Sequence, residues 1–177
     1  MFRVAVTGIG LLSPLGLDVG SFWDGLCAGR SGVDFITEFS TEKLRTDIAA
    51  NVRGFDPKSV LETREIDYTG RVVQLGLAAS LQAVREARLE DVDRTRVGVL
   101  VSSGQGSVEI FVDQVQRAAA RGPRAVSPYF IPSAMPNALS GLIATKLGLR
   151  GPSFNIASAC ATSTHSLAIG ALLILSG

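Results

Sequence analysis

The chain has 177 residues, a net charge of +1, 46% hydrophobic residues and 19% charged residues. This composition supports a folded core in one domain, or one and a fraction, and argues against a disordered chain. The small net charge and the 6% aromatic content argue against a surface for nucleic acid or for an anionic membrane.

The two cysteines, Cys27 and Cys160, lie far apart in sequence, and the chain has one histidine. We therefore expect neither a disulfide framework nor a metal site, and we expect a reducing, cytoplasmic location. Residues 1–3 lead directly into the first expected strand, which predicts that there is no signal peptide. The most apolar stretch, residues 167–175, is about half the length needed to cross a bilayer, so we predict a buried helix and no membrane span.

The first expected strand, residues 4–7, is a short apolar run that ends at Gly8. The following Gly8-Ile9-Gly10 is a weak match to a dinucleotide-binding turn, because Ser13 stands where a third glycine should be. A short helix is predicted over residues 19–28, with Gly29 as its C-terminal cap. Cys27 lies in that helix and is interpreted as a small buried apolar residue.

Residues 30–69 are predicted to be irregular, and a long helix is predicted over residues 70–87. A strand over residues 97–102 follows; its unbroken apolar character indicates burial on both faces, as in a parallel sheet covered by helices. Residues 103–107 form a turn before a helix over residues 108–120. The long helix has a broad apolar face, which is made by Val72, Val73, Leu75, Ala79, Leu81 and Val84.

Four prolines, at positions 123, 128, 132 and 136, predict a loop without secondary structure over residues 121–137. A helix over residues 138–146, a strand over 153–157 and a last helix from Ala161 complete the predicted elements. This alternation of strands and helices predicts an α/β fold with a mostly parallel sheet covered by helices.

Cys160 has the sequence context of a nucleophile, because small residues turn the chain between the end of a strand and the start of an apolar helix. The free N–H groups and the dipole at a helix N-terminus stabilise a thiolate, which is the reactive form of cysteine. Backbone N–H groups in such a turn can also donate to a developing oxyanion. From spacing alone, a buried structural cysteine remains the competing interpretation.

Four segments in chain order resemble the β-ketoacyl-acyl carrier protein synthases, and together they span essentially the whole chain. They are VAVTGIG at residues 4–10 with SPLG at 13–16, GPR at 122–124 with SPYFIP at 127–132, LGLRGP at 147–152, and the active-site segment GPSFNIASACATS at 151–163. The resemblance implies a thiolase-like fold of two similar α/β halves, usually dimeric, with residues 1–177 as an incomplete N-terminal synthase domain that lacks its closing strands.

The resemblance also implies a two-stage reaction in which Cys160 is the nucleophile. An acyl group would move from the phosphopantetheine of acyl carrier protein to Cys160, and decarboxylated malonyl-carrier protein would then attack the thioester. No bound cofactor is expected. Phe130 matches a residue that lines the partner subunit's acyl pocket, so a homodimer is expected. Gln105 falls where the family often places an apolar or small pocket gate, and a polar residue there leaves the preferred acyl length open.

The family takes two catalytic histidines from its C-terminal half, whereas His165 matches a histidine of the nucleophile helix. We therefore expect this chain alone to be acylated but not to condense, and we expect it to be the N-terminal part of an elongating β-ketoacyl synthase of fatty-acid synthesis. Two alternatives stay open: a fragment of a polyketide ketosynthase, and a non-catalytic partner that dimerises or binds carrier protein. Cys160 argues against a partner of the kind that keeps the fold but has lost the cysteine, whereas a fragment that only dimerises or binds carrier protein stays open.

Overall fold

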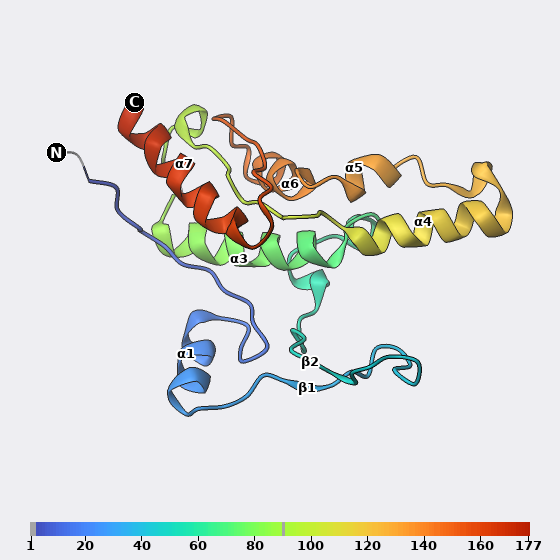
Figure 1. The fold of residues 1–177 in the computed structure, drawn as a ribbon. Helices are drawn as coiled ribbons and strands as arrows, with labels where there is room; N and C mark the ends of the chain where they lie inside the picture. Colours follow the sequence, from blue (N-terminus) through green and yellow to red (C-terminus); the bar gives the residue numbers. More distant parts are fainter. Residues whose placement is uncertain (1–2, 90) are drawn as a thin grey trace.

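Helix α3 runs through the centre of the structure, and the α4–α5 pair projects from one side of it (Figure 1). The computed structural model describes residues 3–89 and 91–177. Met1 and Phe2, which lead into the expected first strand, lie outside the described residues. The α-helices are α1 (Val19–Cys27), α2 (Thr63–Ile66), α3 (Arg71–Ala87), α4 (Val108–Arg121), α5 (Phe130–Ala134), α6 (Ala138–Leu147) and α7 (Thr162–Ser176). The strands are β1 (Asp34–Phe35) and β2 (Ile48–Ala49), and the 3₁₀ turns are η1 (Pro57–Ser59), η2 (Arg94–Arg96), η3 (Pro123–Ala125) and η4 (Ala159–Ala161).

The buried core forms where α3 packs against α6. Leu77 is fully buried, and Val73, Leu139 and Ile143 are 2–3% exposed. Gly76 allows the close approach, since a Cβ at this position would lie 2.4 Å from the Leu139 side chain. The predicted long helix and the predicted helix before Gly148 are thus both confirmed, to within one residue at each end.

The segments predicted as strands at residues 97–102 and 153–157 lie side by side in parallel, but neither forms a regular strand. The Val99 N–H donates to the Pro152 carbonyl at 2.8 Å, and the Phe154 N–H donates to the Val99 carbonyl at 3.3 Å. A single parallel bridge, between Val99 and Ser153, results. The predicted parallel sheet is therefore present within the described residues only as this short pairing, which nevertheless fixes the segment leading to Cys160.

The prediction of a strand at residues 4–7 is wrong, since this segment is extended but is not assigned as a strand. The residues that follow run along α3, and their backbone N–H groups donate hydrogen bonds to side chains of this helix. Ile9 donates to Glu86 at 2.6 Å and Leu11 donates to Gln82 at 3.0 Å. Gly10 permits this contact, because a Cβ there would lie 1.7 Å from a backbone oxygen of α3.

Two regions predicted to lack regular structure contain short elements. In the region 30–69, β1 and β2 pair antiparallel, with Asp34 opposite Ala49, and α2 follows. The Pro-rich segment 121–137 contains η3 and α5. Proline is tolerated in the first turn of a helix, where its missing N–H has no intrahelical partner, and Pro123 begins η3.

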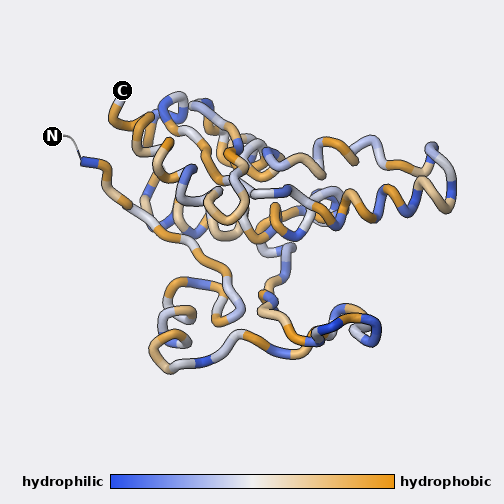
Figure 2. Tube along the Cα trace, in the orientation of Figure 1, coloured by the Kyte–Doolittle hydropathy of each residue, from blue (hydrophilic) through white to orange (hydrophobic). Residues whose placement is uncertain are grey.

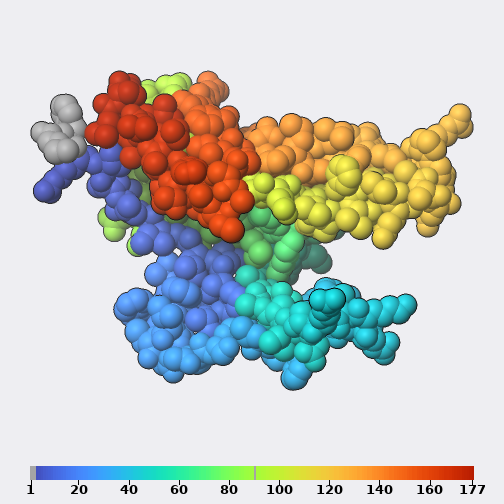
Figure 3. Space-filling model, viewed as in Figure 1, coloured from blue at the N-terminus to red at the C-terminus, as the bar shows by residue number. Residues whose placement is uncertain are grey.

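The last helix, α7, is mostly exposed, so the prediction that residues 167–175 form a buried helix is wrong for this structure. Leu167 is 74% exposed and Ile174 is 65% exposed. Much of α7 is hydrophobic in sequence (Figure 2), and the helix lies on an outer face of the molecule (Figure 3). Residues Ala159–Ser176 are long and apolar enough to cross a membrane by length and composition alone, a test that core helices of soluble proteins also pass. No described residue covers the outward side of α7 at these positions.

An ion pair ties α2 to α6 and gives a testable contribution to stability. Lys146 Nζ lies 2.7 Å from Glu65 Oε2, with side chains 25% and 15% exposed. The hydrogen bond from Lys146, with a second from the Glu62 N–H, lowers the pKa of Glu65 from its usual value. Because the folded-state pKa is the lower one, this stabilisation is present above the pKa of the unfolded chain and is lost as pH falls through the folded value.

We expect Lys146→Met to lower the free energy of unfolding by about 1 kcal/mol at pH 7, and the difference from the parent protein should shrink below about pH 4. Arg64→Gln is the matched control, because the Arg64–Glu62 pair is 82% and 67% exposed and should contribute little. Urea unfolding at pH 7 and pH 3.5 measures both variants. Equal losses for the two variants at pH 7 would contradict this assignment.

Candidate active site

Cys160 lies in a tight turn that connects an extended segment to α7. Ala159 has φ 50°, a left-handed conformation that is rare for residues other than glycine. The turn η4 then leads directly into α7, which begins at Thr162. Non-glycine residues held in this region cost about 1–2 kcal/mol and concentrate at functional sites. Cys160 is thus presented, exposed, at the mouth of the helix that the sequence predicted.

The turn leaves the backbone of Cys160 free to interact with a ligand. The Ala161 N–H donates to the Ser158 carbonyl at 3.1 Å, and the Thr162 N–H donates to the Ala159 carbonyl. These bonds leave the N–H of Cys160 without an acceptor in the part of the chain that the structure describes. A free N–H beside a nucleophilic sulfur can stabilise an oxyanion on the group that it attacks.

Cys160 and Gln105 line the same open hollow, which has a volume of about 560 Å³. The structure therefore brings together two of the three residues predicted for the site. The glycine-rich turn that carries Gln105 lies against the nucleophile turn, since a Cβ on Gly104 would be 3.5 Å from the Ala159 carbonyl oxygen. The hollow is lined by Ser103, Gly104, Gln105, Gly106, Ala157, Ala159 and Cys160.

Side-chain hydrogen bonds hold these two turns together, and sequence reasoning did not identify them. Asn155 Oδ1 accepts from the Ser103 N–H at 2.8 Å. Ser102 Oγ accepts from the Ile156 N–H at 3.1 Å and from Ser166 Oγ at 2.9 Å. The sequence does contain a signal for these bonds. Polar residues stand at the end of one predicted strand, 97–102, and inside the other, 153–157, where their side chains can bond to backbone groups that a short parallel pairing leaves without a partner.

The His165 ring forms a hydrogen bond with the nucleophile turn but not with Cys160 itself. Its Nδ1 lies 2.7 Å from Ser158 Oγ, and no hydrogen bond joins it to Cys160 within residues 3–89 and 91–177. The structure thus agrees with the prediction that His165 lies on the nucleophile helix, and it identifies Ser158 as the partner.

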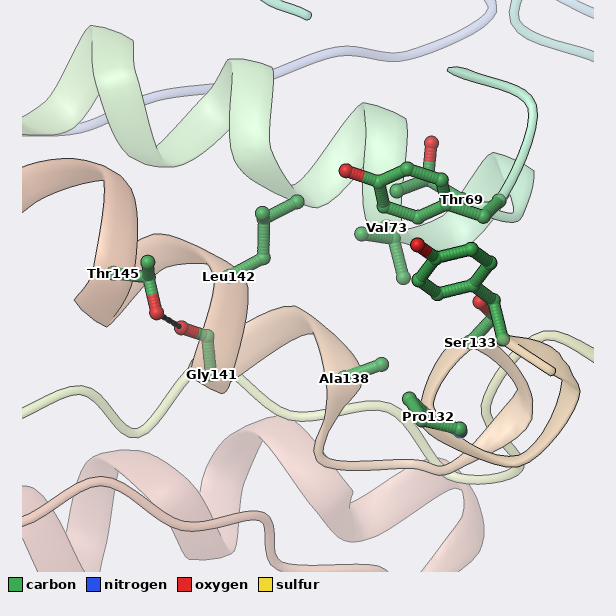
Figure 4. A pocket seen from close by; sticks show the side chains of 10 residues that line it. Thr69, Val73, Pro132, Ser133, Ala138, Gly141, Leu142 and Thr145 are labelled. Carbon is green, nitrogen blue, oxygen red and sulfur yellow. Dashed lines mark hydrogen bonds between the residues drawn. The ribbon is translucent and has the colours of Figure 1, made fainter. Parts of the chain in front are cut away.

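Phe130, the third predicted site residue, lies away from this hollow. It begins α5 and packs against Phe111 of α4, with ring centroids 5.3 Å apart. A separate, mainly apolar cavity of about 210 Å³ lies nearby between α3, α5 and α6 (Figure 4). At its edge Tyr68 and Tyr129 stack at 5.1 Å. Phe130 is not among the described residues that line the Cys160 hollow.

Comparisons with known proteins agree with the family resemblance seen in the sequence. The family described as "Beta-ketoacyl synthase, N-terminal domain" matches residues 1–177. The 3-oxoacyl-[acyl-carrier-protein] synthase 2 of Coxiella burnetii is 40% identical over 174 residues, which cover 97% of this chain and 42% of the relative. The chain thus spans less than half the length of this relative.

Solved structures share the fold. A β-ketoacyl synthase from Burkholderia phymatum superposes with a TM-score of 0.84 at 22% identity, covering all of this chain and 44% of that one. A type II polyketide ketosynthase in complex with its acyl carrier protein gives a TM-score of 0.79 at 20% identity, covering 97% and 46%. The predicted thiolase-like fold class is confirmed by the family match together with this structural similarity. The chain therefore belongs to the β-ketoacyl synthase family, of which it carries the N-terminal domain.

Proposed function

We propose that the protein is a β-ketoacyl-acyl carrier protein synthase of fatty-acid elongation, in which Cys160 is the acyl-accepting nucleophile. The observation that carries this proposal is the position of Cys160. It lies at the mouth of α7, after the left-handed residue Ala159, and shares a hollow with Gln105. The 40% identity to an enzyme named 3-oxoacyl-[acyl-carrier-protein] synthase 2 supports the reaction class.

In the first half-reaction, the Cys160 thiolate attacks the acyl thioester on the phosphopantetheine of the carrier protein. The free N–H of Cys160 stabilises the oxyanion that forms on the carbonyl carbon. Collapse of this intermediate forms the Cys160 thioester and releases the phosphopantetheine thiolate, which takes up a proton. No bound cofactor is needed, since the carrier protein delivers the acyl group already activated.

In the second half-reaction, malonyl-carrier protein loses carbon dioxide, and the resulting carbanion attacks the Cys160 thioester. The product is a β-ketoacyl chain two carbons longer, and the thiolate is regenerated. Decarboxylation needs groups that stabilise the developing enolate. His165, the one histidine of the chain, is bonded to Ser158, so we assign this step to histidines that residues 1–177 do not contain.

The proposed partners are acyl carrier protein and a second copy of the chain. The projecting α4–α5 pair exposes apolar side chains, among them Phe111 at 53% and Ile131 at 57%, which supports burial against another subunit. In that arrangement Phe130 would approach the partner's acyl pocket, while Gln105 would contact the acyl chain within its own subunit. Both cysteines are free thiols, which suits the proposed cytoplasmic location.

We expect residues 1–177 to accept an acyl group from acyl-carrier protein and to form no β-ketoacyl product when malonyl-carrier protein is added. Intact-protein mass spectrometry measures the acyl adduct, and chromatography of the carrier proteins measures the product. Carrier protein without an acyl group is the control. Absence of the adduct would contradict the nucleophile assignment, and a condensed product would contradict the assignment of decarboxylation to other groups.

A polyketide ketosynthase is the second candidate, because the protein shares its fold with such an enzyme. The same assay separates the two candidates when long acyl chains are compared with short polyketide primers. Faster adduct formation with long acyl chains supports the fatty-acid assignment.

A further inference from the structure

All three polar groups of Ser158 are bonded to residues that follow it in the chain, two of which, Thr162 and His165, belong to α7. Its N–H donates to Thr162 Oγ1 at 3.0 Å, its carbonyl accepts from the Ala161 N–H at 3.1 Å, and its Oγ lies 2.7 Å from His165 Nδ1. The first two bonds are local to the turn. The third reaches a full helical turn further, so it ties the nucleophile turn to the body of α7.

This attachment lies beside two residues in unfavourable conformations. Ser158 has φ −144° and ψ 44°, outside the common wells, and Ala159 has φ 50°. Such conformations persist only where surrounding contacts over-determine them. Relaxation of either residue would rotate the peptide that precedes Cys160, and would change both the direction of its N–H and the position of its thiol relative to the α7 N-terminus.

We propose that His165 is a positioning residue that acts through Ser158: the Nδ1–Oγ contact holds Ala159 in the left-handed conformation and so keeps Cys160 at the mouth of α7. The contact can form with either neutral tautomer, because the hydroxyl can donate to a bare Nδ1 or accept from a protonated one. His165 is not a catalytic residue in this proposal, since within the described chain it forms no hydrogen bond with Cys160 and is not among the residues that line the hollow. The inference rests on the proposed function only in taking Cys160 as the nucleophile.

Amide side chains can test the contact, because each reproduces a different atom of imidazole. The asparagine amide reaches about as far as Nδ1, whereas the glutamine amide reaches about as far as Nε2. In a Cys27→Ser background, where Cys160 is the one thiol, iodoacetamide alkylation reports its reactivity without any acyl donor. The test uses the full chain and compares His165→Asn, His165→Gln, Ser158→Ala and the double variant Ser158→Ala/His165→Gln.

We expect His165→Gln and Ser158→Ala each to slow alkylation roughly three- to tenfold, as the loss of one hydrogen bond implies. His165→Asn should stay near the parent rate, and the double variant should be no slower than either single variant, because both remove the same contact. Equal rates for the Asn and Gln variants, or additive losses in the double variant, would overturn the proposal. If His165→Gln fails to fold, a parent-like rate in Ser158→Ala would overturn it equally.

Acyl transfer from acyl-carrier protein, measured on the same variants, separates this inference from the proposed function. If the parent protein is acylated but the four variants all react alike in both assays, only the positioning role fails. If the alkylation pattern is as expected but the parent protein takes no acyl group, the proposed function fails and the positioning of a reactive thiol stands.

Discussion

Cys160→Ala should abolish acyl transfer from acyl-carrier protein, with a loss of at least about 10³-fold in the rate of adduct formation. The reason is that alanine leaves the turn and α7 in place but removes the atom that forms the thioester. Since Cys160 is exposed and its side chain makes no hydrogen bond within the described chain, the free energy of unfolding should change by less than about 0.5 kcal/mol. Quench-flow or manual time courses read by intact mass give the rate.

Cys27→Ala is the matched control, because Cys27 is also a free and exposed thiol but ends α1, away from the hollow. This variant should be acylated at the parent rate. The exposure of Cys27 also corrects the prediction that it is a buried apolar residue. An adduct that persists in Cys160→Ala and disappears in Cys27→Ala would contradict the assignment of the nucleophile.

Gly106→Ala should be the most damaging single-methyl change in the wall of the hollow. Gly106 has φ +74°, and a Cβ there would lie 2.4 Å from the Ala134 carbonyl oxygen and 3.0 Å from the Pro136 nitrogen. Both neighbours are backbone atoms, so the loop must move away from α5. We expect a loss of about 3 kcal/mol or more in the free energy of unfolding, from left-handed strain of about 1 kcal/mol plus the clash.

The displaced loop carries Gln105, and Gly106→Ala should therefore slow Cys160 alkylation as well. Gly29→Ala controls for the strain alone, because Gly29 has φ +64° and no atom within 4 Å of a Cβ. It should lose about 1 kcal/mol and leave alkylation unchanged. Urea unfolding and alkylation measure both effects; equal losses in the two variants would show that the close approach at Gly106 is unimportant.

The helices could be predicted from the sequence because their signals are local. The predicted helix over residues 70–87 corresponds to α3, from Arg71 to Ala87, since its apolar face repeats with the helical period. Gly29 was predicted to cap the first helix because glycine is favoured just after a helix C-terminus, and its positive φ of 64° agrees with that prediction. Such features depend on neighbours within a few residues, which the sequence lists directly.

The strands could not be predicted with the same success, because a strand depends on a partner that the sequence does not name. Residues 4–7 have the composition of a buried strand, yet the chain beside them bonds to Gln82 and Glu86 of α3. The wrong prediction of a buried α7 has the same cause, since burial also depends on a partner that the sequence does not name. Leu167 and Ile174 predict burial by their composition, but burial requires a covering surface, and the described residues provide none at these positions.

The candidate site was predicted in part. Cys160 was singled out by the local sequence of its turn and Gln105 by the family resemblance, and the two residues share one hollow. Ser158 was missed, since its importance comes from a contact with His165 seven residues later. Phe130 lies elsewhere on α5, so its proposed role depends on a second subunit and stays a prediction.

The central claim, that Cys160 carries the acyl group, is tested most directly by locating the adduct. The full chain is incubated with an isotope-labelled acyl-carrier protein, digested, and sequenced by tandem mass spectrometry. We predict the label on the peptide that contains Cys160, as a thioester that hydroxylamine releases. A label on Cys27, or on no residue of a folded protein, would contradict the account.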